Sequence, residues 1–368
     1  MSLSCIHTRA GCSITDASGS IRPCCKYGEL PGLPTIFTES NLNDYLGSKA
    51  YKRLRSQLDS GSFPSGCSSC SRMESAGLQS RRQYTQDFYS GTRVDRGLVD
   101  LEIGLDYTCN MMCRSCGAGA SSRWGSAAGV LDQFDAEGIP RQPSVAYRSY
   151  ADRFREVVAA TDFSAVRHCK IEGGEPFYSR NLGPFLKRLA ATARRPDGLA
   201  LNIFTNASVF PDADVLDLLR RFNTSITFSL DAVGDLAEVI RWGVPWQTVA
   251  DNVARWVEFA EFNTIVCTTV SIQNCNQLAP LIEFCAGLNL EMDFSELMHP
   301  NYLSMYGLPV ATRQGWCQGV PVLDRLLTAD ISVEPEFERL RRSIQILDQY
   351  QGVSFAAANP EIARLIGL

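Results

Sequence analysis

Short runs of apolar and β-branched residues recur along the chain from about residue 98 onward. Six of these runs have the length and composition of strands, and they lie at 99–107, 166–174, 199–207, 225–233, 264–272 and 290–297. The segments between them carry apolar residues at helical spacing, as in YADRFREVVAAT, LGPFLKRLAATARR and WQTVADNVARWVEFAEF, where Val249, Val253, Trp256 and Val257 share one stripe. This alternation of strands and helices predicts an α/β fold with a parallel sheet and right-handed crossovers.

Such a sheet either stays open or curls toward a barrel, and in a barrel the working residues lie on the loops that follow the strands. The stretch CNMMCRSCG, residues 109–117, follows the first predicted strand and places Cys109, Cys113 and Cys116 on one loop. Three thiolates could hold zinc with a distant fourth ligand, or three irons of a 4Fe-4S cube. Because no fourth ligand is near in the sequence, the CxxxCxxC spacing favours a cube with one open iron.

Composition narrows the class of protein. The 368 residues are 45% hydrophobic, enough for a sizeable core, and the net charge of -5 argues against a broad basic surface for nucleic acid. The first residues lack the pattern of a signal peptide, and no apolar run reaches the length of a membrane span. We therefore expect a cytoplasmic enzyme without a membrane partner. In a reducing compartment, the 14 cysteines point to metal or redox chemistry rather than disulfides.

With the cysteine motif after the first strand, the chain resembles the radical S-adenosylmethionine (radical SAM) enzymes, whose fold is a partial (β/α)6 barrel of TIM type. The resemblance implies that Cys109, Cys113 and Cys116 ligate a 4Fe-4S cluster whose open iron binds the methionine part of SAM. A GGEP sequence ends the second predicted strand and matches the family's site for the methionine amino group; its residues are Gly173, Gly174, Glu175 and Pro176.

The same resemblance implies further SAM contacts at the ends of later strands. Asn206, Ser229 and Asp231 are expected to face the ribose or methionine, with plain turn and capping chemistry as the alternative. Arg241, in EVIRWG, is expected to meet the SAM carboxylate, and Ser271 to approach the adenine. One position departs from the family: Ser115 stands before the third cysteine, where many members carry an aromatic residue.

A second group of cysteines lies in the first seventy residues and resembles the auxiliary-cluster region of twitch-type radical SAM proteins. A second 4Fe-4S cluster needs four thiolates, and the candidates are Cys5, Cys24, Cys67 and Cys70. Cys25 is the main rival of Cys24, Cys12 and His7 are weaker substitutes, and a structural zinc is the alternative metal. The expected domains are a twitch-like region at 1–96, the barrel at 97–300 and a closing segment at 301–368.

The resemblance also implies the activity: reductive cleavage of SAM to a 5'-deoxyadenosyl radical, which abstracts hydrogen from a substrate, with flavodoxin or ferredoxin as the electron donor. Net oxidation and redox-neutral rearrangement both stay open. No winged-helix module for a leader peptide is evident, so a small metabolite or a hypermodified nucleotide base is the first choice of substrate. A ribosomally made peptide is the alternative, and a non-catalytic iron-sulfur or zinc scaffold is the alternative of another class. His299, Tyr302, Tyr306, Cys169 and Cys317 are weaker candidates for substrate contact.

Overall fold

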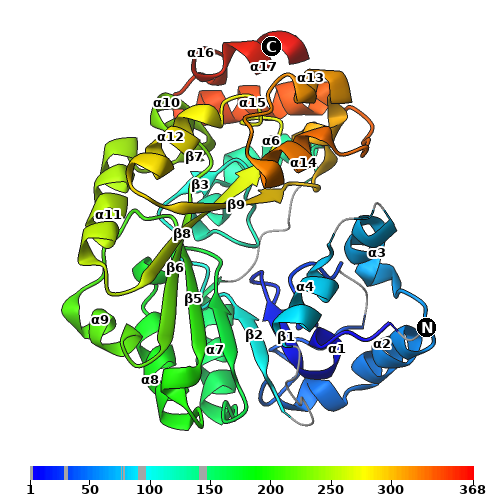
Figure 1. Ribbon diagram of the computed structural model, residues 1–368, viewed down its shortest axis with the longest axis vertical. Coiled ribbons are helices and arrows are strands. Elements are labelled where there is room, and N and C mark those ends of the chain that lie inside the picture. Colours follow the sequence, from blue (N-terminus) through cyan, green and yellow to red (C-terminus); the bar gives the residue numbers. More distant parts are fainter. Residues whose placement is uncertain (1–2, 29–31, 76, 78, 90–96, 141–146) are drawn as a thin grey trace. The chain divides into compact units, whose positions relative to one another are not determined.

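The computed structural model describes residues 3–28, 32–75, 77, 79–89, 97–140 and 147–368 (Figure 1). The chain divides into two compact units, each assembled from segments that are distant in the sequence. The first unit comprises Met1–Tyr107, Val145–Ile203 and Pro211–Thr224, and the second comprises Thr108–Ser144, Phe204–Phe210 and Ser225–Leu368.

The first unit contains parallel strands in the order β1 (Gly11–Ile14), β2 (Asp100–Ile103), β4 (His168–Ile171) and β5 (Ala200–Thr205). Side chains alternate between the two faces of a sheet, and on β2 the buried carboxylates Asp100 and Glu102 alternate with Leu101 and Ile103. One face of this sheet is therefore apolar while the other carries buried charge. The helices of this unit are α1 (His7–Ala10), α2 (Lys49–Asp59), α3 (Ser68–Ser75), α4 (Arg81–Phe88), α7 (Tyr147–Ala160), α8 (Leu182–Thr192) and α9 (Ala213–Leu219).

Helix starts in the first unit follow from capping residues in the sequence. The Ser80 hydroxyl accepts the N–H of Gln83 while the Gln83 side chain accepts the N–H of Ser80, which is a capping box at the start of α4. Ser48 caps α2 and Asp212 caps α9 in the same way, each by accepting a backbone N–H in the first turn. These caps satisfy N–H groups that would otherwise lack partners.

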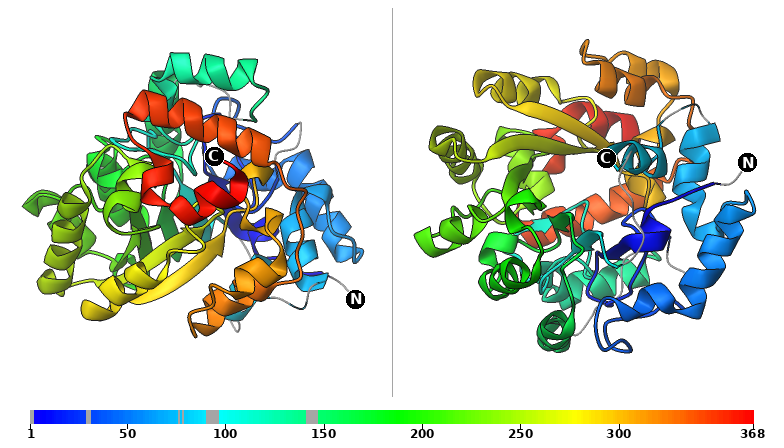
Figure 2. Two further views of the ribbon diagram at one scale, coloured as in Figure 1. Left: turned by 90° about the horizontal axis from the view of Figure 1, so that it is seen from above. Right: turned by 60° about the horizontal axis from the view of Figure 1, so that its bottom comes forward.

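The second unit contains the parallel strands β6 (Asn223–Ser229), β8 (Asn263–Val270) and β9 (Glu291–Glu296), together with a short antiparallel pair, β3 (Met112–Cys113) and β7 (Arg241–Trp242). Helix α15 (Phe337–Gln351) contacts α6 (Ala128–Ala136) (Figure 2). The other helices are α5 (Ser122–Gly125), α10 (Gly234–Ile240), α11 (Trp246–Phe259), α12 (Ala279–Gly287), α13 (Val310–Gln314), α14 (Pro321–Thr328), α16 (Phe355–Ala358) and α17 (Pro360–Ile366).

The predicted α/β fold with a parallel sheet is confirmed, and all six predicted strands are present with slightly different ends. Strand β1 is an addition that the hydrophobic pattern did not predict. The division of the chain at residues 96 and 300 stays a prediction. Within the described residues, no helix is long and apolar enough to cross a membrane.

Candidate functional site

The cysteine loop, residues 109–117, lies in the second unit and is fixed by neighbouring side chains. The Ser122 hydroxyl accepts the N–H of Cys109 at 3.1 Å, and the Trp124 indole N–H donates to the Cys113 carbonyl at 2.8 Å. The N–H of Met111 points at the Cys109 sulfur at 3.4 Å, the kind of contact that stabilises a thiolate. Both Ser122 and Trp124 belong to α5, so the helix that follows the loop also holds it.

The short pair of strands β3 and β7 braces the same loop from the other side. Cys113 lies opposite Arg241 in the antiparallel register, and the N–H of Arg114 donates to the Ile240 carbonyl at 2.8 Å. Directly after β7, Gly243 has a φ of +135°, and a Cβ placed on it would lie 2.6 Å from the carbonyl oxygen of Asn110. The chain therefore passes so close to the cysteine loop that only glycine fits.

We expect Gly243→Ala to destabilise the loop, because alanine adds both a backbone strain of about 1–3 kcal/mol and a steric clash. Thermal unfolding should show a lower midpoint, and the reconstituted protein should hold less iron. Gly234→Ala is the matched control, since Gly234 also has a positive φ, +56°, but a Cβ there meets nothing within 4 Å. An equal loss in both variants would contradict the role of close approach at Gly243.

Two residues that the resemblance placed on SAM are paired with each other. Arg241 Nη1 donates to Asp231 Oδ2 at 2.7 Å, and the other carboxylate oxygen of Asp231 accepts the N–H of Thr269 at 2.8 Å. Asp231 is buried and the Arg241 side chain is 16% exposed. Burial raises the pKa of the Cys113 thiol, and the positive charge of Arg241 opposes that rise.

Asn206 lies at the cysteine loop. Its side-chain Nδ2 donates to Asn110 Oδ1 at 3.1 Å and lies 4.0 Å from the Cys109 sulfur. Its side-chain Oδ1 accepts the N–H of Ser208 at 2.9 Å. These contacts connect the end of β5 to the first cysteine. Asn110, Ser122, Trp124 and Ser208 were not predicted, since a lone Asn, Ser or Trp in the sequence carries no signal of its own.

Two cavities of the second unit adjoin the cysteine loop. One, of about 250 Å³ including open space, is lined by Ser271 and Asp231 and shares Arg114 with the second cavity. The second, of about 750 Å³ including open space, lies beside Cys116 and is also lined by His299 and Tyr302. The remaining lining of the larger cavity includes aromatic and apolar side chains: Trp124, Leu131, Phe134, Leu303 and Leu347.

Ser271 and Ser229 keep their predicted places near strand ends. The Ser271 hydroxyl contacts Asn274 Oδ1 at 3.2 Å, and Ser229 is the last residue of β6, opposite Cys267 of β8. Tyr306 is buried under the guanidinium of Arg313, whose carbon lies 4.9 Å from the ring centroid. That position gives Tyr306 a packing role.

The GGEP segment lies in the first unit, directly after β4. Gly173 and Gly174 both have positive φ, and a Cβ on Gly173 would lie 2.6 Å from the Tyr107 ring. The buried Glu175 carboxylate accepts the N–H of Phe177 at 3.1 Å, which starts the 3-10 turn that contains Pro176. The two glycines thus follow from a tight turn packed on an aromatic ring.

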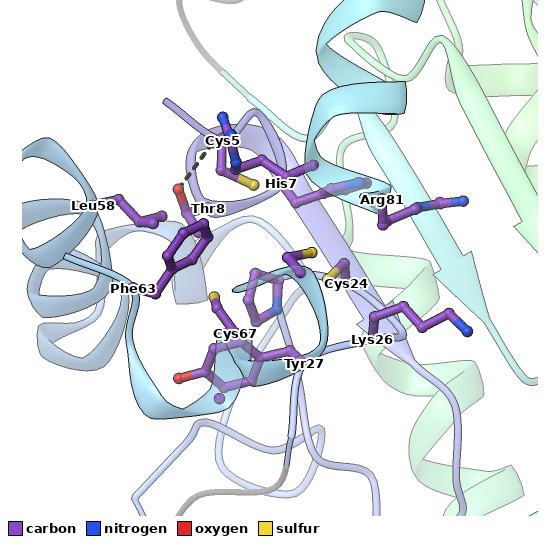
Figure 3. Close-up of a pocket in the computed structure, with 14 residues that line it drawn as sticks. Cys5, His7, Thr8, Cys24, Lys26, Tyr27, Leu58, Phe63, Cys67 and Arg81 are labelled. Carbon is purple, nitrogen blue, oxygen red and sulfur yellow. Dashed lines mark hydrogen bonds between the residues drawn. The ribbon is translucent and has the colours of Figure 1, made fainter. Parts of the chain in front are cut away.

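Four of the amino-terminal cysteines line one cavity of the first unit, of about 400 Å³ including open space: Cys5, Cys24, Cys67 and Cys70. Figure 3 shows the thiols of Cys5, Cys24 and Cys67 directed toward this space, with Tyr27 and Phe63 beside it. We call it the four-cysteine cavity. Burial raises the pKa of the Cys67 thiol to about 12 and also raises that of Cys5 and Cys24. Thiolates here would therefore need positive charge, which metal ions supply.

Cys25 does not line the four-cysteine cavity. Its N–H donates to Glu102 Oε2 at 2.8 Å and its thiol lies 3.5 Å from Glu102 Oε1, the same carboxylate oxygen that pairs with Arg81. Cys24 faces the cavity instead, and the N–H of Tyr27 donates to its carbonyl at 3.1 Å. Adjacent residues of an extended or turning chain point to different sides, which separates the two thiols.

The two weaker candidates for a ligand of the second cluster, Cys12 and His7, have other contacts. Cys12 is buried in β1, opposite Leu101 of β2. His7 lines the cavity, but its Nε2 is hydrogen-bonded to Thr85 at 2.9 Å. Among the residues that the structure describes, no three His, Cys, Asp or Glu side chains converge tightly enough for a single metal ion.

The donor sets at both places suit iron-sulfur clusters. The four-cysteine cavity offers four thiols, of which Cys67 and Cys70 come from one segment. The cysteine loop offers three thiols, with an N–H directed at one of them and a guanidinium near another. Tetrahedral zinc, with Zn–S distances of about 2.3 Å, draws its thiolates closer together than the corners of a cube.

Residues 107–284 match the family model described as Radical SAM superfamily. A search of curated protein sequences finds no significant match. The model match begins just before the cysteine loop and includes GGEP, β6 and Arg241.

Solved structures with a similar arrangement are themselves radical SAM proteins or bind SAM. SuiB of Streptococcus suis bound to S-adenosylmethionine is 14% identical with a TM-score of 0.37, over 76% of this chain and 49% of that one. The protein anSMEcpe with bound AdoMet and the Cp18Cys peptide is 12% identical with a TM-score of 0.38, over 58% of this chain and 55% of that one. SuiB bound to its precursor peptide SuiA is 13% identical with a TM-score of 0.36, over 91% of this chain and 59% of that one.

This chain therefore spans about half the length of the SuiB structure with SAM. The family match rests on the sequence model, which covers the cysteine loop, the GGEP turn and the strands that follow. On that match, residues 107–284 of this chain are similar to the radical SAM superfamily.

Proposed function

We propose that this protein holds a 4Fe-4S cluster through Cys109, Cys113 and Cys116, binds SAM at it, and uses the radical from SAM to abstract hydrogen from a substrate. The observation that carries the proposal is the CxxxCxxC loop inside a region that matches the radical SAM family model. When bound, a cluster with one open iron supplies the electron that cleaves SAM. The chain contributes the thiols, the bracing of their loop and the exclusion of water around it.

Further residues are proposed to bind SAM, as the resemblance to the family implies. Glu175 and the backbone of Gly173 and Gly174 are proposed for the methionine amino group, because a carboxylate and backbone carbonyls suit an ammonium. Ser271 and Asp231, which line the smaller cavity, are proposed for the adenosine part. Asn206, Ser229 and Arg241 stay candidates of the same proposal.

A second cluster is proposed in the four-cysteine cavity, on Cys5, Cys24, Cys67 and Cys70. The shared cavity supports this ligand set, and the contacts of Cys25 with Glu102 support Cys24 over its neighbour. With all four corners taken by thiolates, such a cluster would serve electron transfer rather than direct substrate binding. The region around it is the proposed twitch-like domain.

A small metabolite or nucleotide base was the first choice from the sequence, with a ribosomally made peptide as the alternative. Peptides are bound in the structures of SuiB and anSMEcpe, which agrees with the alternative. Since those likenesses have TM-scores of 0.36 and 0.38, the substrate test includes both classes.

EPR spectra of the dithionite-reduced protein test SAM binding directly. Addition of SAM should change the EPR signal of the cluster on the cysteine loop. Cys109→Ala should remove that signal and its response to SAM, while the signal of the cluster in the four-cysteine cavity remains. For the substrate, peptide and small-molecule fractions from cells grown in deuterated medium would be added separately. The fraction that transfers deuterium into 5'-deoxyadenosine contains the substrate, and a spectrum indifferent to SAM would overturn the proposal.

A further inference from the structure

The structure places Arg241 directly across a strand pair from a cysteine of the CxxxCxxC loop. In the antiparallel pair β3 and β7, Cys113 and Arg241 are register partners. Residues opposite each other in such a pair lie on the same face, with Cβ atoms about 4.5–5.5 Å apart. The backbone of Arg241 is therefore fixed beside Cys113, the second cysteine of the loop.

The charge of Arg241 is held in place by Asp231. Their contact is 2.7 Å, and the Asp231 carboxylate is itself anchored by the N–H of Thr269 and by burial. The Asn274 amide donates to the Asp231 carbonyl at 2.8 Å and fixes the backbone there. Nε of Arg241 is buried and has no hydrogen-bond partner among the described residues.

The Arg241–Asp231 pair places a positive charge near the cysteine loop, with a negative charge in contact with it. Arg241 is the register partner of Cys113, and Asp231 is hydrogen-bonded to Arg241 at 2.7 Å. Charges in a buried site are weakly screened, so a fixed ion pair of this kind acts strongly on a neighbouring group that gains or loses an electron.

Resting on the proposed function, we infer that Arg241 and Asp231 together set the reduction potential of the cluster on Cys109, Cys113 and Cys116. The one-electron reduction adds a negative charge to the cluster. Arg241 stabilises that added charge and raises the potential, while Asp231 destabilises it and lowers the potential. Arg241 is thereby a tuning residue whose own position depends on Asp231.

Four proteins test the inference through the potential: wild type, Arg241→Gln, Asp231→Asn and the double variant. Each would be titrated anaerobically without SAM, following the EPR signal that is lost in a Cys109→Ala, Cys113→Ala, Cys116→Ala triple variant. We expect the reduction potential to be highest in Asp231→Asn, followed by wild type and then the double variant, and lowest in Arg241→Gln. Arg241→Lys, which keeps the charge, should lie nearer to wild type than Arg241→Gln.

Arg255→Gln is the matched control. Arg255 is an exposed arginine of α11 in the same unit, and its guanidinium lies over the Phe210 ring at 3.8 Å. Its removal should leave the potential unchanged. A merely structural role of the pair would lower cluster occupancy in both single variants without shifts of opposite sign.

The outcomes separate this inference from the proposed function. Unchanged potentials, or shifts of the same sign in the two single variants, would overturn the inference while leaving the cluster assignment intact. If the EPR signal persists in the triple-cysteine variant and no other signal is lost, the proposed cluster site itself fails. If Arg241→Gln cannot hold the cluster, an Asp231→Asn potential at or below that of wild type would still reject the inference.

Discussion

Cys113→Ala is expected to reduce 5'-deoxyadenosine formation to the level seen without protein. Cys113 is buried, its carbonyl accepts the Trp124 indole N–H, and the N–H of the adjacent Arg114 donates to the Ile240 carbonyl. With only two thiolates left on the loop, a cube would have two unprotected irons. The variant should bind about four fewer irons per chain than wild type, which iron and sulfide analysis would measure.

Cys285→Ala controls for the loss of any buried thiol. Cys285 is buried in α12 and is absent from the cavities described above. Its loss should lower stability somewhat, as removal of a small buried side chain does, but should leave SAM cleavage and iron content unchanged. Wild-type turnover by Cys113→Ala would refute the assignment of the loop as the cluster site.

The second large effect concerns the adjacent cysteines of the amino-terminal region. Cys24→Ala is expected to lose about four irons per chain, because its thiol is one of four that line the four-cysteine cavity. Cys25→Ala should keep them, because the Cys25 thiol faces Glu102. Iron analysis and the iron-sulfur absorption of the two variants, reconstituted side by side, measure the difference.

The two variants are matched controls for each other, since the residues are adjacent in the chain and both substitutions remove one thiol. Equal losses of iron would mean that both thiols take part, and a loss only in Cys25→Ala would reverse the ligand assignment. A protein that binds one zinc in place of about four irons at this site would point instead to the structural-metal alternative.

The hydrophobic pattern was enough for the main strands and helices. Strands β4, β5, β6 and β8 each combine apolar and β-branched residues over four to eight positions, and each begins within two residues of its predicted run. Strand β9, EMDFSE, also lies within its predicted run. Strand β1 was missed because its four residues, GCSI, are too short to show a pattern, and it is stabilised by pairing with β2, which is distant in the sequence. The two-residue strands β3 and β7 were missed for the same reason.

The site residues could be predicted where their spacing in the sequence brings them together. They could not be predicted where contacts between distant segments determine which residues meet. The three cysteines of CxxxCxxC stand together in the sequence, so their proximity required no fold. The choice between Cys24 and Cys25 depends on Glu102, which lies 77 residues further on. The contact of Arg241 with Asp231 likewise depends on how the end of β6 meets β7, and no local pattern records it.

The central claim is tested most directly by 5'-deoxyadenosine formation. Anaerobically reconstituted protein would be given SAM and dithionite, with iron and sulfide counted on the same sample. The account predicts 5'-deoxyadenosine from protein that holds about eight irons per chain. A fully loaded sample that neither forms 5'-deoxyadenosine nor binds SAM would contradict it.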